Sequence, residues 1–161
     1  MTNPTRLTRL LPILAVALAT AAASAPAHAH EPPAPFEPAS IAWADAPPVL
    51  PAGAEIAVLA GDPHAEGPFV LRLKFPAGYE VPAHTHSGDE LITVISGTFN
   101  VGHGEALDRM ATLPLPAGGF VEMPAGHPHF AWVAAETIVQ IHGPGPFDIR
   151  YLDPADDPLT Q

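Results

Sequence analysis

Apolar residues after position 40 occur in short runs that Gly and Pro interrupt. These runs are rich in Val, Ile, Phe and Thr, which favour β-strands, and the run from Phe69 to Phe75 partly alternates apolar and polar positions. We expect strands over Glu55–Ala60, Phe69–Phe75, Val81–His86, Glu90–Ile95, Thr98–Val101, Gly119–Met123, His129–Val133, Thr137–His142 and Phe147–Leu152. Many short strands joined by turns predict an all-β sandwich or barrel.

Proline content argues against long helices. The chain has 22 prolines among 161 residues, and each one removes a backbone donor and clashes with the preceding helical turn. Only Glu105–Ala111 could form a helical turn or two. The length suits a single domain.

The first thirty residues differ from the rest of the chain. Arg6 and Arg9 form a basic start, Leu10–Ala23 is an apolar run, and Ala27-His28-Ala29 matches a cleavage pattern. We therefore expect a signal peptide over residues 1–29 and a periplasmic or secreted protein. A retained anchor helix is the alternative, but the apolar run is short for a membrane span.

The remaining sequence divides into three parts. Residues 30–40 are rich in Pro and Ala and predict an extended leader. Residues 41–153 contain the expected strands and form the β domain, and residues 154–161 predict a loose acidic tail. The chain has no cysteine, so an exported domain must be stable through its hydrophobic core rather than through disulfides.

Charge limits the classes of partner. The net charge is −11 with His neutral, and all 17 acidic residues follow position 30. Such a surface gains nothing from nucleic acid or from an anionic membrane, because both partners are themselves negative. We therefore expect no nucleic acid, and no membrane contact once the signal peptide is cleaved.

Metal-ligand side chains gather in two segments. His84 and His86 are two residues apart in an expected strand and so face the same side, and Glu90 opens the next strand after a turn. His129 begins another strand, after a Pro-Ala-Gly turn. Three imidazoles and one carboxylate suit one divalent transition metal: Fe, Mn, Ni, Co, Zn or Cu. Four protein ligands would leave a six-coordinate metal open to water, substrate or dioxygen.

These segments resemble the two sequence motifs of the cupin superfamily. The first motif is matched, at the family's spacing, by Gly78, His84, His86, Glu90 and Gly97, and the second by Gly118, Pro124, Gly126 and His129. Val133 stands where the second motif has Asn, which is not a ligand in the family. The resemblance covers about residues 41–153, and the chain also looks like small, single-domain exported cupins of bacteria. It implies a small jelly-roll β-barrel with the metal held inside one end.

The resemblance leaves the activity open. One interpretation is a metal-dependent enzyme that acts on a small organic molecule by oxygenation, isomerisation or lyase chemistry, dioxygenases included. The alternative is a non-catalytic periplasmic cupin that binds a small ligand or a metal. The face of the expected strand Thr137–His142 that points inward distinguishes the two interpretations. If Gln140 and His142 face inward, they are candidate catalytic residues; if Val139 and Ile141 do, an apolar lining favours binding.

Two aromatic residues need a cover. If His129 faces inward, Phe130 and Trp132 face outward on the same strand. The cover could be the N-terminal segment with Trp43, or an adjacent sheet. It could instead be a partner subunit in a homodimer, because exposed aromatic patches often mark interfaces.

Overall fold

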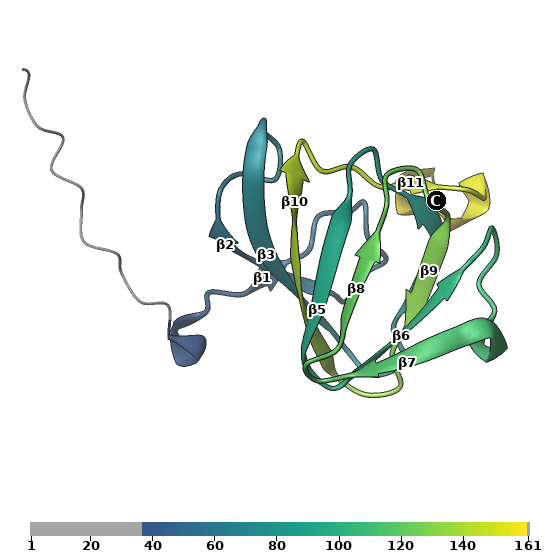
Figure 1. Ribbon diagram of the computed structural model, residues 1–161, viewed down its shortest axis with the longest axis horizontal. Coiled ribbons are helices and arrows are strands. Elements are labelled where there is room, and N and C mark those ends of the chain that lie inside the picture. Colours follow the sequence, from purple (N-terminus) through teal and green to yellow (C-terminus); the bar gives the residue numbers. More distant parts are fainter. Residues whose placement is uncertain (1–36, 161) are drawn as a thin grey trace, which may run out of the picture. The chain divides into compact units, whose positions relative to one another are not determined.

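The computed structural model describes residues 37–160, so the expected signal peptide and residues 30–36 of the leader lie outside the described residues. Two antiparallel sheets make up the fold (Figure 1). In spatial order the first contains β1 (Ala44–Asp45), β2 (Glu55–Ala60), β3 (Gly67–Phe75), β10 (Thr137–Gly145), β5 (Glu90–Ser96) and β8 (Phe120–Met123). The second contains β11 (Arg150–Tyr151), β4 (Glu80–Thr85), β9 (His129–Trp132), β6 (Thr98–His103) and β7 (Thr112–Pro116).

Helical structure in residues 37–160 is limited to short 3-10 turns. They are η1 (Pro38–Ser40), η2 (Arg109–Ala111), η3 (Pro154–Asp156) and η4 (Pro158–Thr160). None of the helices in this part of the chain is long and apolar enough to span a membrane. The all-β prediction is confirmed, and the helical turn expected over Glu105–Ala111 is reduced to η2.

The core lies between the inner faces of the two sheets. On β3, Phe69, Leu71, Leu73 and Phe75 are buried, and the residues between them are partly exposed, so the alternation in the sequence marks the core face. Strand β10 pairs with β3 along its whole length. Because directly paired residues of neighbouring strands share a face, the apolar residues of β10 must also point inward.

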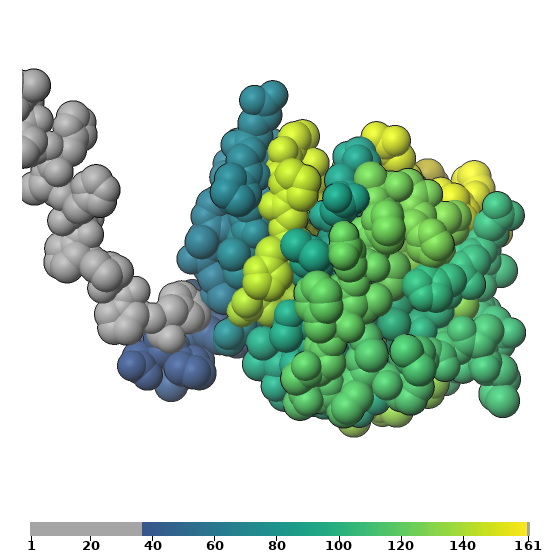
Figure 2. Space-filling model, viewed as in Figure 1, coloured from purple at the N-terminus to yellow at the C-terminus, as the bar shows by residue number. Residues whose placement is uncertain are grey.

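This pairing decides the orientation of β10. Val139 and Ile141 are buried opposite Leu73 and Leu71, and the alternative in which Gln140 and His142 face inward is wrong. Both polar residues lie on the outer face of the first sheet, where β3, β10, β5 and β8 are visible side by side (Figure 2). The structure therefore places Gln140 and His142, the candidate catalytic residues, outside the barrel.

The aromatic residues of β9 are covered by the chain itself. Phe130 is only 1% exposed and packs against Gly102 of the neighbouring strand, where any side chain would clash with its ring. Trp132 donates its Nε1–H to Thr112 Oγ1 over 3.2 Å, and the Arg109 guanidinium lies 4.7 Å from its ring centroid. Trp132 is thus covered by the segment around η2, which none of the three expected covers included.

Two strands were not predicted from the sequence, and the reason can be given for each. Strand β7 reads Thr-Leu-Pro-Leu-Pro, and two prolines weaken any strand prediction. It is an edge strand, where a missing backbone donor can face away from the sheet. Strand β1 has two residues, too few for a pattern. Conversely, the expected strand Phe147–Leu152 is reduced to Arg150–Tyr151.

The two glycines that frame the first motif should differ in their tolerance of a side chain. Both have positive φ, but a Cβ at Gly97 would lie 2.6 Å from the Glu136 carbonyl oxygen, whereas a Cβ at Gly78 meets nothing within 4 Å. We expect Gly78→Ala to cost about 1 kcal/mol from its left-handed backbone alone. Gly97→Ala should cost about 3 kcal/mol or more, because backbone must also shift. Urea unfolding of both variants measures this, and equal destabilisation would contradict it.

Candidate metal centre

A β-bulge in β4 aims the first two histidines inward. Val81 pairs with Ala131 and His84 with His129, so β4 holds one residue more than β9 between these two pairs. In an unbroken strand Val81 and His84, three residues apart, would face opposite sides. The extra residue reverses the alternation, as bulges do, and both side chains line the interior.

The four predicted ligands come together between the two sheets. His84 and His129 are directly paired on β4 and β9, and His86 follows the end of β4. Glu90 is the first residue of β5 in the other sheet. All four side chains are buried. One ring nitrogen from each histidine lies within 4.8 Å of the others, so the three imidazoles form a group that could hold a metal ion.

Backbone carbonyls fix the orientation of each imidazole. The Nδ1 atom of His84 lies 2.6 Å from the Pro82 oxygen, that of His86 lies 2.5 Å from the Asp148 oxygen, and that of His129 lies 2.9 Å from the His127 oxygen. A carbonyl oxygen can only accept, so each Nδ1 carries the proton in these bonds. Each neutral ring then leaves its Nε2 lone pair free, which is the tautomer a metal ligand needs.

Glu90 lies against two of these Nε2 atoms. Its Oε2 is 3.3 Å from His86 Nε2 and 3.4 Å from His129 Nε2. The first contact has an ion-pair distance but no hydrogen-bond geometry, so His86 Nε2 is buried without a hydrogen-bond partner among the described residues. A buried polar atom without a partner is costly unless another group satisfies it. The donor set and this nitrogen therefore fit a bound cation.

Burial and mutual proximity shift the pKa values of the cluster. Burial, together with the nearby His129 and His86, lowers the pKa of His84 to about 3. Burial also acts to lower the pKa of His86, but Glu90 and the Asp148 carbonyl outweigh it and the pKa is raised. Burial alone would raise the pKa of Glu90, but contacts with His129 and His86 hold it far below its usual range. Glu90 is thus a carboxylate at neutral pH.

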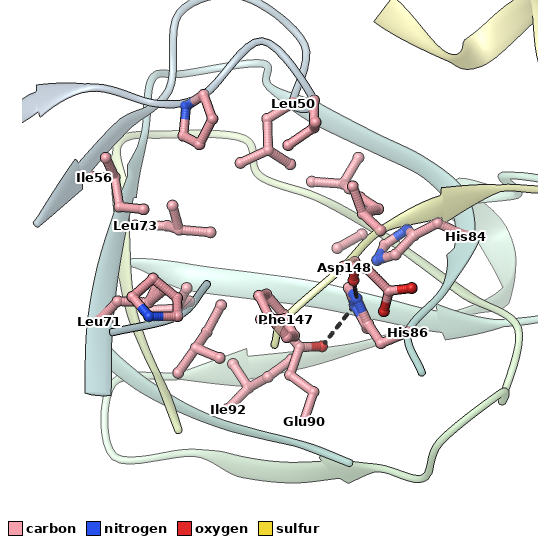
Figure 3. Close-up of a pocket in the computed structure, with 18 of the residues that line it drawn as sticks. Leu50, Ile56, Leu71, Leu73, His84, His86, Glu90, Ile92, Phe147 and Asp148 are labelled. Atoms are coloured by element: carbon pink, nitrogen blue, oxygen red, sulfur yellow. Dashed lines mark hydrogen bonds and ion pairs between the residues drawn. The ribbon is translucent and has the colours of Figure 1, made fainter. Parts of the chain in front are cut away.

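The centre opens on an internal cavity of about 350 Å³. Figure 3 shows His84, His86 and Asp148 at one end, and Leu50 and Leu73 away from them. The inner face of β10 contributes only hydrocarbon side chains to the wall. The site therefore combines a polar end that can bind a cation with apolar walls that can bury an organic molecule.

Three cavity residues could not be recognised as site residues from the sequence. The Phe147 ring stacks on the His86 ring with centroids 4.6 Å apart. The Asp148 carboxylate accepts from the Ser87 N–H over 2.7 Å and pairs with Arg150 at 2.8 Å. His64 lies in an exposed turn and also lines the cavity. All three lie in irregular connections outside the two histidine motifs, and no motif or spacing marks them as site residues.

Comparison with solved structures identifies the class of fold. The chain is similar to a proposed acetylacetone dioxygenase from Methylibium petroleiphilum PM1, with 18% identity, 80% of this chain and 87% of that chain covered, and a TM-score of 0.59. It is also similar to the polyketide cyclase RemF from Streptomyces resistomycificus, with 18% identity, coverage of 65% and 75%, and a TM-score of 0.54. An RmlC-like cupin from Shewanella frigidimarina NCIMB 400 matches with 16% identity, coverage of 68% and 87%, and a TM-score of 0.53.

These likenesses establish that the protein has the cupin fold, which confirms the jelly-roll expectation. The sequence places it further: the model of the family described as "Domain of unknown function (DUF4437)" matches residues 42–157, and the chain belongs to that family. Comparison with curated proteins gave no match.

The His84 environment predicts acid sensitivity of the metal-free protein. Since its pKa falls from 6.5 to about 3 on folding, the unfolded chain binds a proton between these pH values and the folded chain does not. Stability therefore decreases as pH falls through this window, by up to about 1.4 kcal/mol per pH unit. His86 contributes with the opposite sign, because its pKa is raised, and its contribution is lost as pH rises above 6.5.

The measurement is urea unfolding in a chelator between pH 6.5 and pH 5, above the range in which Glu90 protonates. As the pH is lowered, we expect the free energy of unfolding of the unsubstituted protein to decrease more steeply than that of His84→Gln. Equal slopes for the two proteins would show that His84 is not held neutral by the fold.

Proposed function

We propose that this protein is a metal-dependent cupin that binds one divalent transition metal through His84, His86, Glu90 and His129 and acts on a small organic molecule in the adjoining cavity. The observation that carries the proposal is the set of three Nδ1–H bonds to backbone carbonyls, which leaves three Nε2 lone pairs at one point beside a buried carboxylate. Such an arrangement has a high desolvation cost for Glu90 that a bound cation would offset.

The metal would supply Lewis acidity, or redox chemistry with dioxygen if it is iron(II). The chain's own residues set a largely hydrocarbon wall beside the polar end, and they fix the imidazoles before any ligand arrives. Oxygenation, isomerisation and lyase-type cleavage are all compatible with this arrangement. The names of two similar structures, a proposed dioxygenase and a cyclase, lend the enzymatic interpretation some support.

A non-catalytic binding protein is the second candidate, and one observation favours it. With Gln140 and His142 on the outer face, the polar cavity residues besides the four proposed ligands are His64 and Asp148. Both Asp148 oxygens are engaged, one by Ser87 and one by Arg150, and these partners hold its pKa below the usual value although burial opposes this. A carboxylate held in this way is a poor proton donor.

Metal binding should depend on the inner histidines and not on histidines in general. After incubation with Fe(II), Mn, Co, Ni, Zn or Cu and removal of excess ion, we expect about one equivalent per chain for at least one metal. His84→Ala and His129→Ala should retain less than about a tenth of it, because each removes a ligand. His142→Ala, on the outer face, is the matched control and should bind fully. Equal metal content in all variants, measured by plasma mass spectrometry, would contradict the site.

Turnover separates the two candidate functions. The protein loaded with its preferred metal should convert some member of a panel of small metabolites, in air or without oxygen, and His84→Ala should not. Nuclear magnetic resonance of the reaction mixture detects products of any of the three reaction types. Metal-dependent product formation would remove the binding-only candidate, whereas saturable binding without products would support it.

A further inference from the structure

The cavity has a single polar end. His84, His86, Glu90, His129 and Asp148 surround it, and His64 is the one further polar residue on the wall. Leu50, Ile56, Leu71 and Leu73 lie away from the histidines, as Figure 3 shows. The described wall contains no Ser, Thr, Asn, Gln or Tyr side chain. A ligand in this cavity therefore finds its polar partners almost entirely in one place.

Cations are also missing from the described wall. Every Lys and Arg of residues 37–160 contacts a polar partner and lies outside the cavity lining: Arg72 with Gln140, Lys74 with Glu55, Arg109 with Glu80, and Arg150 with Asp148. A phosphate or a second carboxylate on a ligand would meet no fixed positive charge. Burying such a group without a partner is strongly unfavourable.

We propose that the site takes a small neutral or monoanionic molecule with one metal-binding polar end and an apolar body. Sugars are disfavoured because several hydroxyl groups would lose water and gain no partner. An apolar body gains from burial against Leu71 and Leu73. The proposal rests on the proposed function, and it adds the chemical class of the ligand. The cavity volume, about 350 Å³, is near the lower end of the range for ligand pockets and suits a small body such as a short chain or a ring.

Three hydroxamates with one metal-binding head test the class. Acetohydroxamate carries almost no body, hexanohydroxamate adds four methylenes, and 6-aminohexanohydroxamate ends a similar chain in a charge. Titration calorimetry of the metal-loaded protein should give hexanohydroxamate at least about tenfold tighter than acetohydroxamate, because each buried methylene contributes several-fold. The charged chain should lose most of this gain. Equal affinity for all three would overturn the proposal.

A matched pair of variants on β2 locates the body. Ile56 lines the cavity, whereas Val58 on the same strand is 48% exposed and outside its lining. Ile56→Thr should reduce the advantage of hexanohydroxamate at least about threefold and leave metal content and acetohydroxamate affinity unchanged. Val58→Thr should change none of them. Equal effects of the two substitutions would also overturn the proposal.

Failure of the proposed function has a different signature. A protein that takes up no metal refutes the metal centre, and the ligand class is then tested in the metal-free protein with hexanoate against acetate. Methyl resonances of Val139 and Ile141, both on the cavity wall, report binding. Methyl shifts with hexanoate but not with acetate support an apolar ligand body. No shift with hexanoate at saturating concentration overturns the proposed ligand class.

Discussion

The orientation of three imidazoles by backbone carbonyls is the interaction on which the site depends. The acceptors belong to Pro82, His127 and Asp148, which lie in β4, in the turn before β9 and in the connection that leads to β11. Because the acceptor in each case is main chain, the path of the backbone sets the direction of every Nε2 lone pair. Side-chain identity at these three positions therefore matters less than the course of the backbone through them.

Hydrogen bonds between the connecting segments support this arrangement. Gly126 donates its N–H to the His86 carbonyl over 2.8 Å, and Asp89 accepts from the Ala125 N–H at the same distance, so the turn within the first motif is bonded to the turn of the second. Phe147 donates its N–H to the Pro63 oxygen over 2.7 Å, which joins the segment that orients His86 to a loop at the cavity. The centre is therefore held by connections between strands as much as by the strands themselves.

Much of this protein could be predicted from its sequence. The alternation on β3 marks the core face directly. The spacing of His84, His86, Glu90 and His129 matched a known motif, and this match predicted both the fold and the clustering of the four residues. The face of β10 stayed ambiguous because its residues alternate between apolar and polar groups that are each compatible with an interior. It was decided only by pairing with β3, which is a tertiary property.

Other features could not be predicted because they depend on contacts between distant segments. The carbonyl of Asp148 reaches His86 across 62 residues, and any residue type would offer the same oxygen. The cover of Phe130 required a close approach to Gly102 that has no local signature. The bulge in β4 has one local sign, Pro82, because proline within a sheet is confined to edge strands, strand starts and bulges. That sign does not say which side chains the extra residue turns inward, which depends on the pairing with β9.

The bulge in β4 also connects strand register to ion occupancy. The same residues could pair with β9 in an unbroken ladder, which would leave Val81 in the core but turn His84 and His86 to solvent. Hydrogen bonding favours regular pairing, whereas a cation held by the imidazoles would stabilise only the bulged form, by mass action. Regular backbone pairing and ion binding thus favour different registers of β4. A bound metal would select the register that contains the extra residue.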